Sequence, residues 1–183
     1  MVWIALGVGS VLALLIAVLA TSKSASEVEA ASPLLGKPAP AVSGPTLQGP
    51  TAGLNALRGK WVLVNFFASW CVPCQREMPE LVRFQDRHAT SGDAVVLAVR
   101  YDDPDDGPLR GLMTRYHAGW SIVDDSQAKV DWGVGGIPES YLVDPNGIVL
   151  SRIVGGVNAD ALEALLNRAK AVEGTTQVPA QAP

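Results

Sequence analysis

The chain has 183 residues, of which 48% are hydrophobic and 17% are charged. This length is too short for two ordinary domains and this composition is too apolar for a disordered chain, so we expect one compact domain and a separate apolar segment. The formal net charge of −4 offers no basic surface to neutralise phosphate groups, which argues against nucleic acid as a partner.

The chain begins with an uncharged apolar segment. A helix over residues 2–20 would just cross a hydrocarbon core of about 30 Å, so we predict a single transmembrane anchor over residues 1–21. A cleaved signal peptide is the alternative, but the apolar run is long and no Lys or Arg precedes it. Because Lys23 follows the run and no basic residue precedes it, charge does not decide the orientation, which has to be inferred from the chemistry.

Three segments follow the predicted anchor. Residues 22–35 are mostly small and polar, which predicts a flexible tether. Residues 36–170 carry the apolar patterns of one compact domain. Residues 171–183 are poor core formers, and we predict a disordered tail.

Within the domain, strand patterns and helix patterns alternate. Residues 61–67 and 94–99 are continuous apolar runs, typical of strands buried on both faces of a mostly parallel sheet. Each run is followed by apolar residues at helical spacing, namely Met78, Leu81 and Val82 after the first and Leu109, Leu112, Met113 and Tyr116 after the second.

The last third of the domain predicts a hairpin and a final helix. Residues 144–147, Asp-Pro-Asn-Gly, form a turn signal between two antiparallel strands, and Asn158 can cap the helix that follows. A short strand is possible over residues 121–123. The predicted order is strand, helix, strand, helix, hairpin, helix.

The two cysteines of the chain, Cys71 and Cys74, lie where the first strand ends and the first helix begins. At this spacing on a helical turn the pair can close a small ring and cycle between dithiol and disulfide. The helix N-terminus stabilises a thiolate at Cys71, which makes it the expected nucleophile and Cys74 the resolving thiol. Pro73 suits an early helical position and holds the turn rigid.

A static disulfide and half of a zinc site are the alternatives to redox chemistry. A ring this short restricts the unfolded chain little, which disfavours a purely structural disulfide. Zinc would need two further ligands, whereas the two histidines, His88 and His117, stand alone in helical patterns. We therefore expect no metal and no other cofactor beyond the redox-active disulfide.

The segment WVLVNFFASWCVPCQREMPEL resembles the active-site segment of the TlpA, ResA and CcmG group of membrane-anchored thioredoxin-fold oxidoreductases. The entry segment from Leu34 and the stretch GVGGIPESYLVDPNGIV are similar to the same group, so that the resemblance covers roughly residues 34–168. It implies an α/β fold, a thioredoxin-like three-layer sandwich with a central mixed sheet and a βα insertion, preceded by one transmembrane helix.

The resemblance also implies roles for individual residues. Pro138 matches a cis-proline loop beside the disulfide, so Ile137 and Pro138 are expected to contact the substrate polypeptide, together with Pro73 and the aromatic platform of Trp70. Without the resemblance, an ordinary trans proline would be the simpler interpretation. Glu139 follows Pro138 directly in the sequence.

Asn65 stands where thioredoxin carries a buried acid, so proton handling is expected to pass to Glu77, with Glu139 as a second candidate. A carboxylate near the thiols raises the pKa of a thiol by like-charge repulsion, which suits a reductant. The alternative for each acid is a solvated surface charge. Residues 102–106, which are rich in Asp but lack the spacing of a calcium loop, are expected to form a solvated loop.

By this resemblance the chain is an extracytoplasmic thiol-disulfide oxidoreductase of the cell membrane. It would reduce haem-site disulfides of apocytochrome c during cytochrome c maturation and be recharged by a CcdA- or DsbD-type membrane thiol donor. The alternatives are a general reductase, a TlpA-like oxidase-assembly factor, and a non-catalytic thioredoxin-fold binding module.

Overall fold

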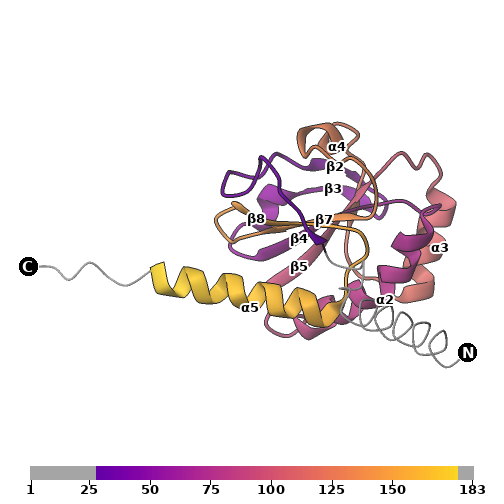
Figure 1. Cartoon of the computed structure of the whole chain (residues 1–183). Coiled ribbons are helices and arrows are strands. Elements are labelled where there is room, and N and C mark those ends of the chain that lie inside the picture. The colour runs from indigo at the N-terminus through magenta and orange to yellow at the C-terminus, as the bar shows by residue number, and fades with distance from the viewer. Residues whose placement is uncertain (1–27, 177–183) are drawn as a thin grey trace, which may run out of the picture.

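The computed structural model describes residues 28–176 of the chain (Figure 1). The predicted anchor and the first part of the predicted tether lie outside the described residues. Within residues 28–176, no helix combines the length and apolar character needed to cross a membrane. The elements in chain order are β1 (Val28–Glu29), β2 (Ser43–Thr46), β3 (Gly49–Gly53), η1 (Leu54–Leu57), β4 (Trp61–Phe67), α2 (Val72–Arg87), β5 (Ala94–Arg100), α3 (Asp106–Tyr116), β6 (Ile122–Val123), α4 (Ala128–Asp131), β7 (Glu139–Val143), β8 (Val149–Val154) and α5 (Ala159–Thr176).

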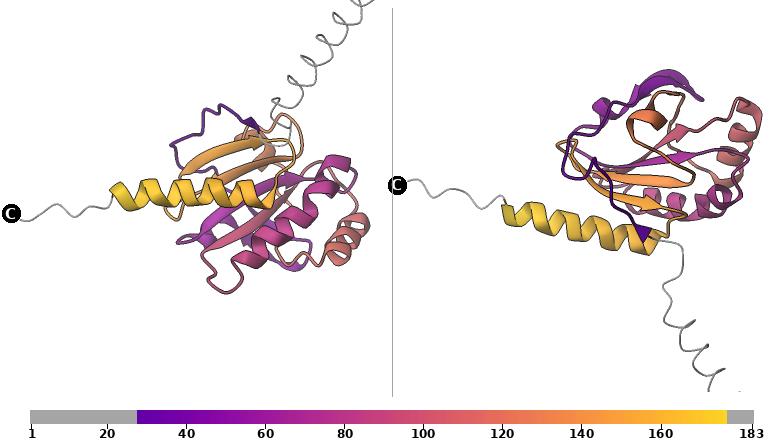
Figure 2. Two further views of the ribbon diagram at one scale, coloured as in Figure 1. Left: turned by 60° about the horizontal axis from the view of Figure 1, so that its bottom comes forward. Right: turned by 45° about the horizontal axis from the view of Figure 1, so that its top comes forward.

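The described strands form one mixed sheet in the order β1-β8-β7-β4-β5-β6-β2-β3. β4 pairs in parallel with β5 and antiparallel with β7, so it lies in the middle of the sheet with a neighbour on each side. Helices α2, α3 and α5 cover one face, and the short α4 lies on the other (Figures 1 and 2). This is the expected α/β arrangement of three layers.

The core lies on both faces of the sheet because the central strand is buried throughout. All seven residues of β4 are buried, and its side chains alternate between the two faces. Leu63 and Phe67 join the cluster under α2, α3 and α5, whereas Val64 and Phe66 join the cluster on the α4 side. Asn65 is the polar residue of this strand, and by the same alternation it faces α2.

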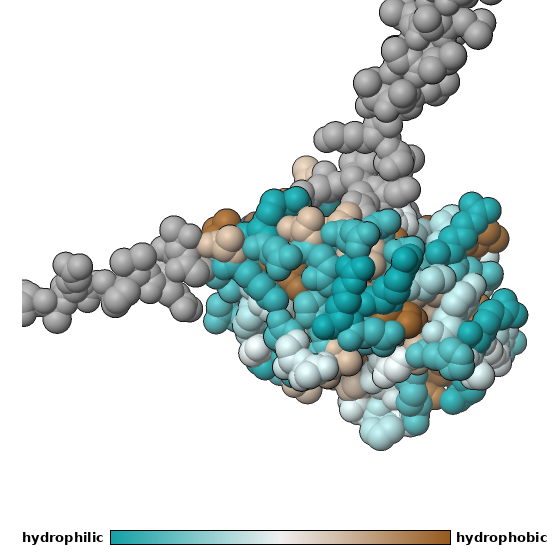
Figure 3. Space-filling view, turned by 90° about the horizontal axis from the view of Figure 1, so that it is seen from below, coloured by the Kyte–Doolittle hydropathy of each residue, from teal (hydrophilic) through white to brown (hydrophobic). Residues whose placement is uncertain are grey.

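The outer surface of the large helical layer is mostly hydrophilic. Figure 3 shows this face from below, with hydrophobic residues in separate patches. The helices are thus amphipathic, as their apolar spacing predicted, with the apolar side turned to the sheet.

The sequence-based elements between residues 61 and 166 are confirmed. β4 and β5 occupy the two apolar runs, and β7 and β8 pair antiparallel across the predicted turn. In that turn Gly147 has a φ of 79°, and the Asp144 carboxylate accepts a hydrogen bond from the amide of Ile148 at 2.6 Å. Asn158 caps α5, since its Oδ1 accepts from the amide of Asp160 at 2.9 Å.

The hairpin of β2 and β3 and the short helix α4 were not predicted. The sequences of the two strands, SGPT and GPTAG, lack the alternating apolar residues by which a strand is predicted. The hairpin lies at the sheet edge and is only partly buried, so it does not need an apolar face. Its backbone pairing, and not its side-chain pattern, makes it part of the sheet.

Two predicted boundaries are corrected. Helix α5 continues to Thr176, so the predicted disordered tail is helical over residues 171–176. Residues 28–39, predicted mostly as tether, instead form a strap that follows β8. Its backbone amides at Ala30, Gly36 and Ala39 donate to carbonyls of or beside β8 at 2.8 to 2.9 Å. Composition could not predict this, because an edge strand offers backbone partners whatever side chains the strap carries.

Candidate active site

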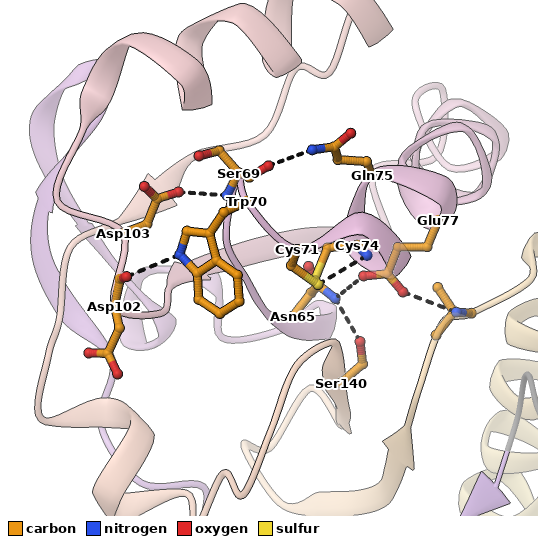
Figure 4. Close-up of a disulfide and its surroundings, with 11 residues drawn as sticks. Asn65, Ser69, Trp70, Cys71, Cys74, Gln75, Glu77, Asp102, Asp103 and Ser140 are labelled. Carbon is orange, nitrogen blue, oxygen red and sulfur yellow. Dashed lines mark hydrogen bonds between the residues drawn. A yellow bond between two sulfur atoms is a disulfide. The ribbon is translucent and has the colours of Figure 1, made fainter.

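The two cysteines form a disulfide at the junction of β4 and α2 (Figure 4). Cys71 is the N-cap residue of α2, and its sulfur accepts a hydrogen bond from the amide of Cys74 at 3.2 Å. The Cα atoms lie 5.2 Å apart. Pro73 lies in the first turn of the helix, as predicted. A thiolate formed at Cys71 would therefore meet the free amides of a helix N-terminus, which stabilise negative charge.

Neither histidine lies with the cysteine pair. His88 is at the other end of α2, where its ring nitrogens lie 2.9 Å from Asp93 and 3.0 Å from Glu163. His117 ends α3 in a left-handed conformation. These positions give the cysteines no histidine with which to form a zinc site.

The disulfide is shielded but has exposed apolar neighbours. Cys71 is 4% exposed and Cys74 is 1% exposed, whereas Trp70 and Val72 on either side of Cys71 are 56% and 54% exposed. Large apolar side chains that remain in water next to a reactive group form a surface on which a polypeptide can bind.

A buried polar network lies behind the disulfide (Figure 4). The Asn65 amide nitrogen lies 2.9 Å from Glu77 Oε1 and 2.9 Å from Ser140 Oγ, and the amide of Val157 donates to Glu77 Oε2 at 3.0 Å. Glu77 is 3% exposed, so the alternative of a solvated surface charge is wrong for this residue. The network joins β4, α2, β7 and the segment before α5.

Burial changes the acid strength of Glu77. Loss of water around the carboxylate raises its pKa to about 7, although the hydrogen bonds from Asn65 and Val157 act in the opposite direction. No ion pair of Glu77 occurs within residues 28–176 to restore the charged form. Glu77 is therefore an acid that can take up or release a proton near neutral pH, one helical turn beyond Cys74.

Glu139, the second candidate for proton handling, lies on the opposite face of the sheet. Ser140 faces the disulfide side with its register partner Asn65, so by strand alternation Glu139 points the other way. There it is 1% exposed and bound by Arg152 through two contacts of 2.8 and 3.0 Å, and it accepts from the hydroxyl of Tyr141. This corrects the expectation that Glu139 tunes the thiols, because sequence proximity to Pro138 does not place its side chain on the same face.

The loop before β7 reaches the disulfide end of the sheet. The Ile137–Pro138 peptide bond is cis, as the resemblance predicted. Glu139 pairs with Phe66 near the end of β4, so the loop lies at the edge where Cys71 follows that strand. Ile137 is partly buried against both core clusters, and the Pro138 carbonyl accepts from the amide of Gly155 at 2.9 Å. Both residues are thus near the cysteine pair in the fold.

The loop between β5 and α3 also belongs to the site, which the sequence analysis missed. Asp103 was expected in a solvated loop but is 4% exposed, and its carboxylate accepts from the amide of Ser69 at 2.5 Å. The carbonyl of Asp102 accepts from the indole of Trp70 at 3.2 Å. The available signal was topological: β4 and β5 are parallel neighbours, so the residues that follow them meet at one edge of the sheet.

Comparisons with known proteins agree with this geometry. Residues 35–152 match the model of the AhpC/TSA family. The chain is 37% identical over 141 residues to the thiol:disulfide interchange protein DsbE of Allochromatium vinosum, covering 70% of this chain and 71% of the relative. It is 42% identical over 102 residues to the thiol:disulfide interchange protein CycY of Rhizobium leguminosarum bv. viciae, covering 55% and 53%.

A solved structure shows the same fold. A DsbE-type thiol:disulfide interchange protein from Chlorobium tepidum superposes with a TM-score of 0.66 at 32% identity, covering 74% of this chain and 96% of that structure. The fold of this chain therefore has a counterpart among proteins named for disulfide interchange.

Proposed function

The chain belongs to the AhpC/TSA family of thioredoxin-fold proteins, and from this premise we propose that it is a membrane-anchored reductase of haem-attachment disulfides in apocytochrome c. Its relatives are thiol-disulfide oxidoreductases, which work through a cysteine pair without a cofactor. The chain is accordingly an enzyme of this class and not a non-catalytic binding module. The observation that carries the reductase part of the proposal is the buried Glu77 behind the disulfide, with a pKa raised to about 7.

The proposed reaction is a two-step exchange. The Cys71 thiolate attacks one sulfur of the substrate disulfide, forming a mixed disulfide and releasing the other substrate sulfur as a thiolate. The Cys74 thiol then loses its proton and attacks Cys71 Sγ, which releases the second substrate sulfur and closes the Cys71–Cys74 disulfide. Two electrons pass to the substrate, and Glu77 is placed to receive the proton of the buried Cys74.

The surface around Cys71 supports binding of an extended polypeptide. Trp70 is exposed on one side of the sulfur, Pro73 stiffens the helix start, and the loop of Ile137 and Pro138 approaches from β7. Backbone groups of that loop are the proposed partners of the substrate strand. These four residues form the proposed substrate surface.

The proposed location is outside the cytoplasm, with residues 2–20 as the anchor and a CcdA- or DsbD-type protein as electron donor. One feature of the described chain supports a partner at the membrane. Val28 pairs with Val154 of β8, and Val154 pairs with Glu139 beside Pro138. A chain that comes from the proposed anchor would thus join the domain at the disulfide edge of the sheet.

Trapping and a redox titration test the proposal. Full-length Cys74→Ser in membranes should accumulate mixed disulfides that include apocytochrome c, because the resolving thiol is absent, whereas Cys71→Ser should trap none. The midpoint potential of the wild-type pair should lie closer to the value of about −270 mV of thioredoxin than to the value of about −120 mV of DsbA, a strong oxidant.

A general reductase or an oxidase-assembly factor would give different results. If the proposed function is correct, the wild-type dithiol should reduce a peptide with a Cys-x-x-Cys-His disulfide faster than a scrambled peptide with the same Cys spacing. Equal rates would favour a general reductase. Trapping of an oxidase subunit in place of apocytochrome c would favour the assembly role, and a midpoint potential near that of DsbA would exclude a reductase.

A further inference from the structure

The loop of residues 101–105, between β5 and α3, holds the segment that leads into Cys71. Its contacts run to the backbone of Ser69 and to the side chain of Trp70 (Figure 4). Both residues directly precede the nucleophilic cysteine, so the loop is placed to control the shape of the surface beside the sulfur.

The peptide unit on each side of Ser69 is restrained. The Asp103 carboxylate accepts from the Ser69 amide at 2.5 Å, and the Gln75 side-chain amide donates to the Ser69 carbonyl at 2.6 Å. The Ser69 residue is buried, with 8% exposure. A backbone held at both its amide and its carbonyl has little freedom to rotate, which fixes the direction in which Trp70 leaves the chain.

The loop itself is anchored. Asp102 has a φ of 42°, a left-handed conformation that is uncommon for a residue other than glycine and that occurs often at functional sites. Its carbonyl accepts from the Trp70 indole, and its carboxylate pairs with Lys129, whose Nζ lies 5.4 Å from the ring centre of Tyr101. The indole is thus held by a loop that α4 secures from the other side.

Asp103 is an unusual residue to find as the acceptor of a buried structural hydrogen bond, because Asp is seldom buried without an ion pair. It is 4% exposed and forms no ion pair within the described part of the chain. A buried carboxylate costs free energy that a neutral acceptor would not, unless hydrogen bonds compensate. Asp103 accepts a hydrogen bond from the Ser69 amide, two residues before Cys71. The acid therefore contacts the backbone segment that leads to the reactive sulfur.

We propose that Asp103 is a positioning residue for disulfide exchange. Its carboxylate fixes the Ser69 backbone and, together with the Asp102 carbonyl, holds the Trp70 indole beside Cys71 so that the ring forms a rigid wall for the substrate polypeptide. The role rests on the proposed contact of Trp70 with substrate. Asp103 should therefore affect the binding of a polypeptide substrate. It should not affect the reaction of a small disulfide that reaches the sulfur without touching the indole.

The test compares two substrates of the full-length protein, kept reduced by dithiothreitol. One is a peptide of about twelve residues with an internal disulfide, and the other is bis(2-hydroxyethyl) disulfide. Asp103→Ala should lower kcat/KM for the peptide about tenfold, mainly through KM, and change the rate with the small disulfide less than about twofold. Asp103→Asn retains an oxygen that accepts from Ser69 and should restore most of the peptide activity.

A double-mutant cycle separates positioning from other roles. If Asp103 acts through the indole, Asp103→Ala should have no further effect on the peptide KM in a Trp70→Ala protein. Asp105→Ala is the matched control: it removes a carboxylate of the same loop that caps α3 through Gly107 and touches neither Ser69 nor Trp70. Its peptide KM should equal that of the wild type.

Three results would overturn the proposal: equal losses with both substrates, full additivity with Trp70→Ala, or failure of Asp103→Asn to restore peptide binding. If Asp103→Ala does not fold, Gln75→Ala provides the test, because it frees the Ser69 carbonyl and leaves the buried Asp103 side chain in place. A peptide KM raised about threefold would support the role, and an unchanged KM would contradict it. Failure to trap apocytochrome c would disprove the proposed substrate but leave these peptide measurements valid.

Discussion

At the scale of single residues, burial and strand alternation separate two glutamates that look alike in the sequence. Glu77 lies behind the disulfide with neutral partners, whereas Glu139 lies across the sheet against Arg152. Within residues 28–176, Glu139 has an ion pair with Arg152 and Glu77 has none. The two residues therefore form a matched pair for testing which acid acts on the thiols.

The first prediction concerns the thiol of Cys71. Glu77→Gln should lower the pKa of this thiol in the reduced protein, because it removes a carboxylate that repels the thiolate above pH 7. Absorbance of the thiolate near 240 nm, titrated against pH, measures the effect. Glu139→Gln serves as the control and should leave the pKa of the Cys71 thiol unchanged. An equal change of this pKa in the two variants would show that the face of the sheet on which a glutamate lies does not determine its effect on the thiol.

The second prediction concerns stability. The pKa of Glu77 is raised from 4.5 to about 7 by folding, so the folded protein binds the proton more tightly than the unfolded chain does. The resulting stabilisation is fully present below about pH 4.5 and is lost as the pH rises through 7. The difference corresponds to about 3 kcal/mol at its largest.

Urea denaturation of the oxidised protein at pH 5 and pH 8.5 measures this loss. The Glu77→Gln protein cannot ionise at this position, so its free energy of unfolding should change less between the two pH values than that of the wild type. Parallel pH profiles of the two proteins would mean that the carboxylate is not held in an apolar environment.

At the scale of secondary-structure elements, the two long helices of the site begin with different caps. The N-cap of α2 is Cys71, with a sulfur as acceptor, so the reactive group itself occupies the cap position. The cap of α5 is Asn158, whose side-chain oxygen accepts from the amides of Asp160 and Ala161 at 2.9 and 3.4 Å. This cap lies next to Val157, which donates to Glu77, so the start of α5 also supports the buried network.

The third prediction follows from this cap. Asn158→Ala should lower the free energy of unfolding by about 1 kcal/mol, because two amides of the first turn lose their acceptor. Asn167→Ala, at an exposed position inside the same helix, should have no destabilising effect, since alanine favours a helix interior. Chemical denaturation of both variants decides the matter, and equal losses would refute the capping role.

At the scale of the whole molecule, the strap of residues 28–39 connects the fold to the segment that precedes it. The strap runs along β8 from the disulfide edge towards the opposite edge, and the Arg152 side chain also donates to the Ala31 carbonyl at 3.1 Å. The same arginine binds Glu139 beside the Pro138 loop. The start of the described chain is thereby fixed relative to the proposed substrate surface.

The fourth prediction is topological. Protease added to intact spheroplasts should separate the cysteine domain from the membrane, because the proposed anchor leaves the domain outside the cytoplasm. A cytoplasmic protein serves as the control for intact membranes. Full protection of the domain until detergent is added would reverse the proposed orientation, and release without protease would indicate that residues 1–21 are not an anchor.

The features that depend on local patterns could be predicted from the sequence. The apolar runs of β4 and β5, the helical spacing of α2 and α3, the turn after β7 and the cap at Asn158 each depend on neighbouring residues, and all are found in the structure. The position of Cys71 at a strand-to-helix junction followed from the same patterns, so the centre of the candidate site was predictable.

The side chains that surround that centre are set by contacts between distant parts of the chain. Strand pairing sets Ser140 beside Asn65 and turns Glu139 away, and the parallel neighbours β4 and β5 bring Asp103 to Ser69. Pairing also makes part of the predicted tether an edge of the sheet. These contacts join residues 30 or more positions apart, where the register of backbone hydrogen bonds, and not the local sequence pattern, determines which side chains meet.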